Sequence, residues 1–178
     1  ETTKCGVEHE KTKGREEINH HQPTVDKKDE AKTAMDKVAQ AKKAEIDQTP
    51  NATEEEKIAA KAKVDEAANN AKASIDQATN NASVDNAKTN GVEAINHVQP
   101  TVVKKDEAKT AIDNVAQAKK AEIDQTPNAT EEEKAAAKAK VDEAANNAKA
   151  SIDQATNNAS VDNAKNKERK DIKHGKTV

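Results

Sequence analysis

The chain has 178 residues, a formal net charge of −3 at pH 7, and charged side chains at 35 % of its positions. It contains no Trp, Tyr, Phe or Leu, which excludes a wide aromatic core, and alanine supplies most of its apolar surface. Acids and bases are interspersed, so the chain offers no basic stripe for nucleic acid and no polybasic anchor for anionic lipid. No stretch approaches the roughly 18 apolar residues of a membrane-spanning helix. We therefore expect neither a nucleic-acid partner nor membrane insertion.

A unit of 77 residues occurs twice in the sequence. Residues 27–88 recur as residues 104–165 with three changes, which are Met35 to Ile112, Lys37 to Asn114 and Ile58 to Ala135. Tandem units of this kind stack into rods or arrays, and Ala, Lys, Glu and Gln are strong helix formers. The sequence thus predicts an all-α protein, a monomer with two tandem antiparallel three-helix bundles joined end to end as an elongated rod.

The first predicted helix, at residues 5–22, is a polar and atypical copy of residues 82–99. Val7 and Ile18 keep the apolar stripe of that copy, and their spacing is typical of one helix face.

The second predicted helix covers residues 25–48. Thr49-Pro50-Asn51 ends it, because proline disfavours helix in the residue before it and cannot continue the hydrogen-bond ladder. The short loop that follows predicts an antiparallel hairpin with the next helix. The apolar side of this helix holds Ala31, Met35, Val38, Ala39 and Ile46.

The third predicted helix runs from Thr53 to about Thr79. Thr53 is its predicted cap and forms a capping box with Glu56, and Thr130 is the predicted cap of the second copy. The acids of the first turn, Glu54, Glu55 and Glu56, oppose the positive end of the helix dipole, and we interpret them as a solvated helix start. An apolar stripe with alternating spacings of 4 and 3 predicts the buried face: Val64, Ala68, Ala71, Ile75, Ala78 and Ala82.

Ser83 and its copy Ser160 are the predicted caps of the helices that follow. The apolar stripe loses phase between Asn80 and Ser83, which indicates a junction between bundles. Since no Pro or Gly intervenes, we expect that junction to be nearly continuous and stiff. Gly91 costs about 1 kcal/mol relative to Ala in a helix interior and predicts a close approach by a neighbouring backbone.

The repeat and the predicted junction divide the chain into three parts. They are a first three-helix repeat at residues 5–82, a second at 83–159, and a partial first helix of a following repeat at 160–178.

Three apolar positions of the internal copy become polar or lose their side chain at the chain ends. They are Val92, Ala94 and Val98, replaced by Arg15, Glu17 and His21 near the start and by Arg169, Asp171 and Gly175 near the end. Terminal units of a stacked array need a polar outer face, so these three residues are the candidate contacts between repeats. An engineered terminus explains the same change without any interface.

Nothing in the sequence carries catalytic or cofactor chemistry. Cys5 is alone, which excludes an internal disulfide. His20 and His97 suit a helix C-terminus better than a metal site, because no second ligand recurs at ligand spacing. No nucleophile with its base and no phosphate-binding glycine loop occurs. We expect a non-catalytic protein without cofactor or metal.

The loop Asp-Gln-Thr-Pro-Asn-Ala-Thr-Glu-Glu-Glu-Lys occurs at residues 47–57 and 124–134, among recurring Ala-Lys and Ile-Asp pairs. It resembles the tandem helical repeat known as domain of unknown function 1542, from staphylococcal cell-wall-anchored surface proteins of the Mrp/FmtB, SasC and Ebh group. The resemblance covers nearly the whole chain and departs at residues 1–26 and 166–178. It implies an extracellular protein that is anchored to the cell wall, with the signal peptide and anchor outside this segment.

The repeat and the resemblance together predict a stalk that spaces a distal binding region from the cell wall, with adjacent repeats of the same chain as partners. Two alternatives stay open. The repeat can itself bind a host matrix or plasma protein, or a like repeat on another cell. It can also act as a mechanical buffer whose units unfold under load.

Overall fold

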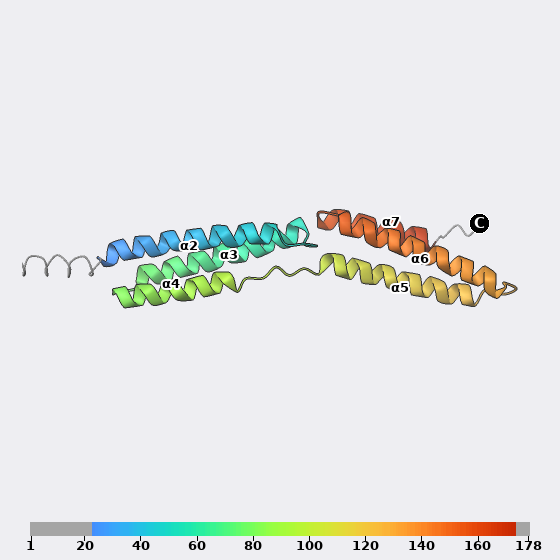
Figure 1. Cartoon of the computed structure of the whole chain (residues 1–178), viewed down its shortest axis with the longest axis horizontal. Coiled ribbons are helices and arrows are strands. Elements are labelled where there is room, and N and C mark those ends of the chain that lie inside the picture. Colours follow the sequence, from blue (N-terminus) through green and yellow to red (C-terminus); the bar gives the residue numbers. More distant parts are fainter. Residues whose placement is uncertain (1–22, 174–178) are drawn as a thin grey trace, which may run out of the picture. The chain divides into compact units, whose positions relative to one another are not determined.

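The computed structural model describes residues 23–173, and this part of the chain is helical without strands (Figure 1). The predicted all-α class is confirmed. The predicted helix at residues 5–22 and the residues after 173 lie outside the described part. The helices are α2 (Thr24–Asp47), α3 (Glu54–Gln77), α4 (Asn81–Asn96), α5 (Lys104–Asp124), α6 (Glu131–Gln154) and α7 (Asn158–Lys173).

Contacts group these helices into two compact units. Unit 1 takes in the chain up to Glu45 and Ala62–Val98, and unit 2 takes in Ile46–Lys61 and the chain from Gln99 onward. Unit 2 therefore contains α5, α6 and α7 together with the α2–α3 loop and the first turns of α3.

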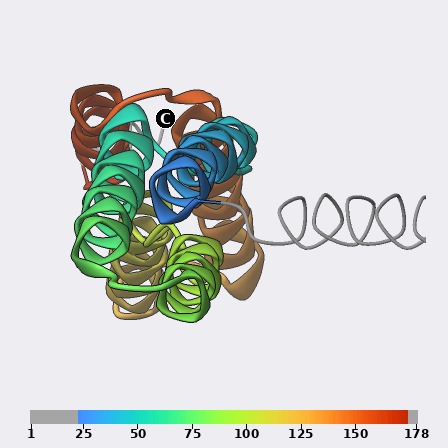
Figure 2. The same ribbon diagram turned by 90° about the vertical axis from the view of Figure 1, so that its left-hand side faces the viewer.

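Each unit is a three-helix bundle with alternating helix directions. Figure 2 looks nearly along the helices of unit 1 and shows α2, α3 and α4 at the corners of a triangle. Lys27 Nζ lies 2.9 Å from Asp85 Oδ2 and joins the N-terminal ends of α2 and α4, which are parallel. Lys28 Nζ donates to the carbonyl oxygen of Asp76 at 2.9 Å, so α3 ends where α2 begins and is antiparallel to both.

The helix that completes each bundle follows the hairpin instead of preceding it, which corrects the predicted division into residues 5–82 and 83–159. Residues 81–96 form α4 of unit 1, and the core of unit 2 comes from α5, α6 and α7. The predicted continuous junction is also wrong, because Asn80 is extended at φ −145° and ψ 171° and interrupts the helix. A connection this short makes neighbouring helices antiparallel, and the lost phase of the apolar stripe marks that turn.

Asparagines hold the N-cap positions at these turns. Asn80 Oδ1 accepts the Ser83 N–H at 2.8 Å, and the Asn80 N–H donates to Ser83 Oγ at 3.1 Å. Asn157 and Ser160 repeat the pair at 2.8 and 3.1 Å. Ser83 and Ser160, which we predicted as N-caps, stand three residues further on and supply the second half of a capping box.

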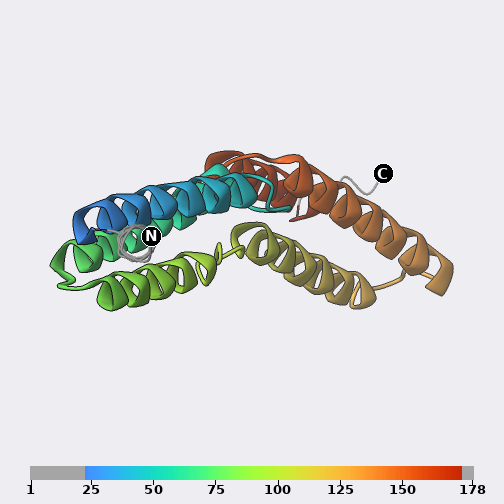
Figure 3. The same cartoon turned by 60° about the vertical axis from the view of Figure 1, so that its left-hand side comes forward.

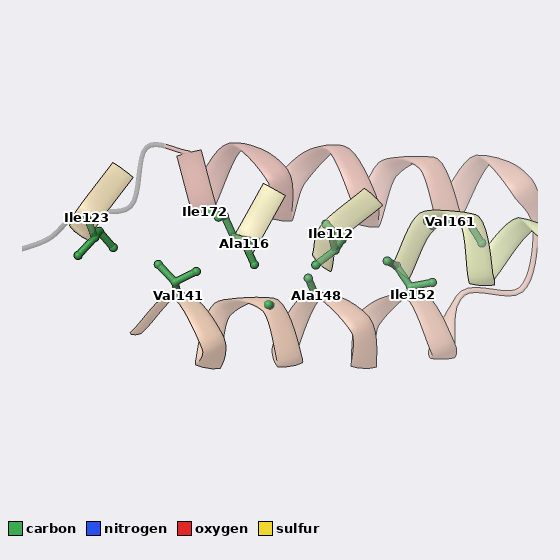
Figure 4. Close-up of a cluster of buried hydrophobic side chains, with 10 residues drawn as sticks. Ile112, Ala116, Ile123, Val141, Ala148, Ile152, Val161 and Ile172 are labelled. Carbon is green, nitrogen blue, oxygen red and sulfur yellow. The ribbon is translucent and has the colours of Figure 1, made fainter. Parts of the chain in front are cut away.

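Apolar side chains from all three helices of unit 2 point into the space between them (Figure 4). Ile112 and Ile152 are fully buried, and burying such a side chain contributes about 1.5–3 kcal/mol. Small alanines between them let the helix backbones approach closely. The ten core residues are Ala108, Ile112, Ala116, Ile123, Val141, Ala145, Ala148, Ile152, Val161 and Ile172.

Gly91 marks a close approach between the helices of unit 1. A Cβ atom at this position would lie 2.6 Å from Ala71 Cβ and 2.7 Å from Met35 Sδ. Because real Cβ atoms do not approach other atoms so closely, only glycine fits between these two neighbours without a shift. The second copy has Ile112 and Glu168 where the first has Met35 and Gly91.

Lysine–aspartate pairs connect the helices at the same positions in both copies. The side chains of these pairs are partly exposed, so each contributes only about 0–1 kcal/mol and serves mainly to match neighbouring helices in register. In unit 1 the pairs are Lys27–Asp85, Lys32–Asp76, Lys43–Asp65 and Lys72–Asp36. Their counterparts in unit 2 are Lys104–Asp162, Lys109–Asp153, Lys120–Asp142 and Lys149–Asp113.

Candidate functional site

The described residues hold no group of three or more His, Cys, Asp or Glu side chains that could bind a metal ion. His97 is exposed at the C-cap of α4. Among the helices of residues 23–173, none is both long and apolar enough to cross a membrane. The candidate site consists instead of hydrogen bonds that the hairpin loops make with other segments of the chain.

The two hairpin loops are identical in sequence, and we call them the first tip (Ile46–Lys57) and the second tip (Ile123–Lys134). Asn51 and Asn128 adopt left-handed backbone conformations at φ 65° and 66°, which Asn tolerates better than most residues. The turn is thus built alike in both copies, and any difference between the tips arises from their surroundings.

Glu56 of the first tip serves two helices with one carboxylate. Its Oε1 accepts the Thr53 N–H at 2.9 Å, and the Glu56 N–H donates to Thr53 Oγ1 at 3.3 Å, which is a capping box at the start of α3. Its Oε2 accepts the N–H groups of Val103 and Lys104 at 2.7 and 3.2 Å. Val103 is the N-cap of α5 and makes no side-chain cap. Glu56 therefore supplies the cap that α5 lacks.

The preceding acids of the first tip bind the turn between α6 and α7. Glu55 Oε2 accepts the N–H of Asn158, the first residue of α7, at 2.8 Å. The Glu54 N–H donates to the carbonyl oxygen of Thr156 at 2.9 Å. Carboxylates at helix N-termini are favoured by the orphan N–H groups and the helix dipole. Two helix N-termini of unit 2 are thus satisfied by Glu55 and Glu56, and Glu54 adds a hydrogen bond to the turn before α7.

Burial and hydrogen bonding act in opposite directions on the pKa of Glu56. Partial burial raises it, but the N–H groups of Thr53, Val103 and Lys104 donate to the ionised carboxylate and lower it, and the net pKa lies below its ordinary value. The carboxylate is therefore ionised at neutral pH, the form that accepts these hydrogen bonds.

The second tip keeps the threonine cap of the first, but the Glu133 carboxylate accepts the Thr130 hydroxyl where the Glu56 carboxylate accepts the Thr53 N–H. Thr130 Oγ1 accepts the Glu133 N–H at 3.1 Å and lies 3.2 Å from Glu133 Oε1. Its surroundings differ, because Thr130 is exposed whereas the equivalent Thr53 is 0 % exposed. Figure 3 shows the α5–α6 loop that carries the second tip at the end of these two helices.

The predicted helix caps and the predicted contacts between repeats lie in different parts of the fold. Thr53 and Thr130 stand at the starts of α3 and α6. Val92 and Val98 are half-buried and Ala94 is exposed, all three in unit 1. They remain a prediction for contact between repeats.

Sequence reasoning missed the acids of the first tip. We interpreted Glu54, Glu55 and Glu56 as a solvated helix start, and Glu55 and Glu56 instead accept N–H groups far along the chain. Their partners are backbone groups, which carry no residue signature. The one available signal was Val103, a residue that cannot cap the helix that follows it.

The fold and the tip contacts define a tandem array of small helical repeats. The chain belongs to the family described as Domain of Unknown Function (DUF1542), which matches residues 27–103 and 104–177. These two matches place the repeat boundary between Val103 and Lys104. The chain is accordingly a tandem repeat region of this family.

The curated relatives are much longer proteins. The chain is 30 % identical over 142 residues to "Extracellular matrix-binding protein EbhA" of Staphylococcus aureus strain Newman and to "Extracellular matrix-binding protein ebh" of strain NCTC 8325 / PS 47. Each match covers 80 % of this chain but only 4 % and 2 % of the relative. No solved structure matches the chain.

Proposed function

We propose that this chain is a stalk segment of a bacterial surface protein, which spaces a distal binding region from the cell wall. The observation that carries the proposal is the place of the first tip, which is encoded in the first copy and built into unit 2. A hairpin end that is hydrogen-bonded by the following copy couples successive repeats. Coupled repeats are what a spacer needs, because its use lies in length and stiffness.

The repeated features support the same proposal. Both copies keep the lysine–aspartate pairs and the Asn–Ser caps at equivalent positions, and the described residues hold no metal-binding group in either copy. Helices of 24 residues at 1.5 Å per residue give each bundle a length of about 36 Å. A spacer built end to end would gain about this length with each added repeat.

A replacement experiment tests the spacer role. A binding domain is displayed on bacteria through two copies of this repeat, and the repeats are then exchanged for an unrelated rigid helical spacer of equal length. We expect adhesion to be retained after the exchange and lost when the repeats are deleted. Loss of adhesion with the equal-length replacement would contradict the spacer role.

One observation favours a second function, in which the repeat itself binds a host protein. The relatives are named as extracellular matrix-binding proteins, although the matched part is a small share of each. A single repeat and the full chain are immobilised separately, and each is incubated with plasma and matrix proteins. Saturable binding that doubles with repeat number would support this function, and its absence would support the stalk.

A further inference from the structure

The second tip has the same sequence as the first tip, which is hydrogen-bonded to the starts of α5 and α7. Residues 46–57 and 123–134 are identical, yet Ala52 is 7 % and Thr53 0 % exposed, while Thr130 is exposed. Since the sequence is the same, the difference comes from the neighbours of each tip.

The acceptor groups of the second tip are already arranged. At the second tip, Thr130 Oγ1 accepts the Glu133 N–H and donates to Glu133 Oε1, so two hydrogen bonds hold the carboxylate beside the start of α6. A groove of about 380 Å³ lies beside these groups and is lined in part by Ile123, Ala129 and Glu133. Little reorganisation is needed for the carboxylates to receive N–H donors, which lowers the cost of binding.

The first tip shows which donors fit. Val103 and Lys104 offer N–H groups at a helix start with no side-chain cap, and Asn158 offers the N–H of a second helix start. The partner of such a tip must present two helix N-termini side by side, one of which, like that of α5, has no side-chain cap. A bundle of this repeat presents them at α5 and α7.

The start of α2 does not fit a tip, although it occupies the equivalent place in the first copy. Its Lys27 N–H already donates to the carbonyl oxygen of Pro23 at 3.0 Å. Asp26 stands where the second copy has Val103, and its charge would repel a glutamate. The starts of α5 and α7 are taken by the first tip. Within residues 23–173, a second molecule of this chain therefore presents no suitable pair of helix starts.

We propose that the second tip is the docking surface for a further tandem copy of the repeat, one that begins as the second copy does. Glu133 would accept the N–H groups at the start of its first helix, and Glu132 the N–H at the start of its third. The Glu131 N–H would donate to its turn as Glu54 does to Thr156. The inference does not depend on the stalk proposal, because repeats that bind a host protein would join in the same way.

Hydrogen exchange of the Glu131 amide tests the proposal. The chain is lengthened by inserting a second copy of residues 89–165 after Lys165, which adds a repeat with the internal linker. We expect Glu131 exchange to slow about tenfold, the upper range expected from one amide–carbonyl hydrogen bond. The Glu54 amide, which already has its acceptor, is the internal control and should keep its rate.

Glu133→Gln separates docking from folding, because the glutamine amide oxygen can still accept the Thr130 hydroxyl. In the lengthened chain the substitution should reverse most of the slowing at Glu131, and in the 178-residue chain it should leave the rate unchanged. Equal Glu131 rates in the two chains would overturn the proposal. So would slowing in the 178-residue chain as its concentration rises, since the tip would then take a second molecule.

Discussion

Glu56 links the chemistry of one side chain to the stability of unit 2. Its pKa is lower in the folded protein than its ordinary value of 4.5. The stabilisation is therefore present above pH 4.5 and is lost as the pH falls through the lower folded-state pKa. We expect Glu56→Gln to reduce this acid dependence in urea unfolding measured between pH 3 and pH 6. The same change at Glu133 is the control, and equal effects at the two positions would contradict a special role for Glu56.

Gly91 tests the close packing of unit 1. Ala is the better helix former by about 1 kcal/mol, but its Cβ would overlap Ala71 and Met35. Overpacking of this kind costs about 1–3 kcal/mol, so we expect Gly91→Ala to lower the free energy of unfolding, measured by urea titration. The neighbouring Asn90 is exposed, and Asn90→Ala should be neutral or stabilising. A stabilising Gly91→Ala would show that the helices lie further apart.

The N-caps of α3 and α6 are both threonines, but they differ in burial and in the contacts around them. Thr130→Ala removes an exposed N-cap and should cost about 1 kcal/mol. Thr53→Ala removes the same cap where the side chain is fully buried and where Glu56 also holds α5, so we expect a loss near 2 kcal/mol or above. Thermal and urea unfolding of the two variants give this comparison directly. Equal losses would mean that the surroundings of the first tip add nothing.

Helix positions could be predicted from the sequence because their causes are local. Pro50 ends α2, Thr53 begins α3, and the stripe through Val64 and Ile75 is buried as its spacing indicates. The grouping of helices could not be predicted, because the stripe through Val84 and Ile95 packs equally well against a preceding or a following hairpin. The deciding feature is a turn of three residues, and Asn80 gives only a weak sign of it. The tip contacts were hidden because their donors are backbone groups.

At the scale of the whole molecule, the alanine-rich bundles and the contacts of the first tip support the proposal that successive repeats are coupled. The long helices α2 and α3 each contribute residues to both compact units. Exposed ion pairs add little stability individually, so buried alanine and isoleucine must supply most of it. Under the proposed stalk function, a longer reach requires only more copies of the repeat, and neither aromatic residues nor a ligand pocket.

Small-angle X-ray scattering of the 178-residue chain tests this account most directly. The proposed stalk function requires the bundles to be joined end to end, which would give a rod of roughly 70–80 Å and a radius of gyration above about 20 Å. A compact globule of this length would have a radius of gyration of about 16 Å. The rod is the result that the account predicts, and the globule would contradict it.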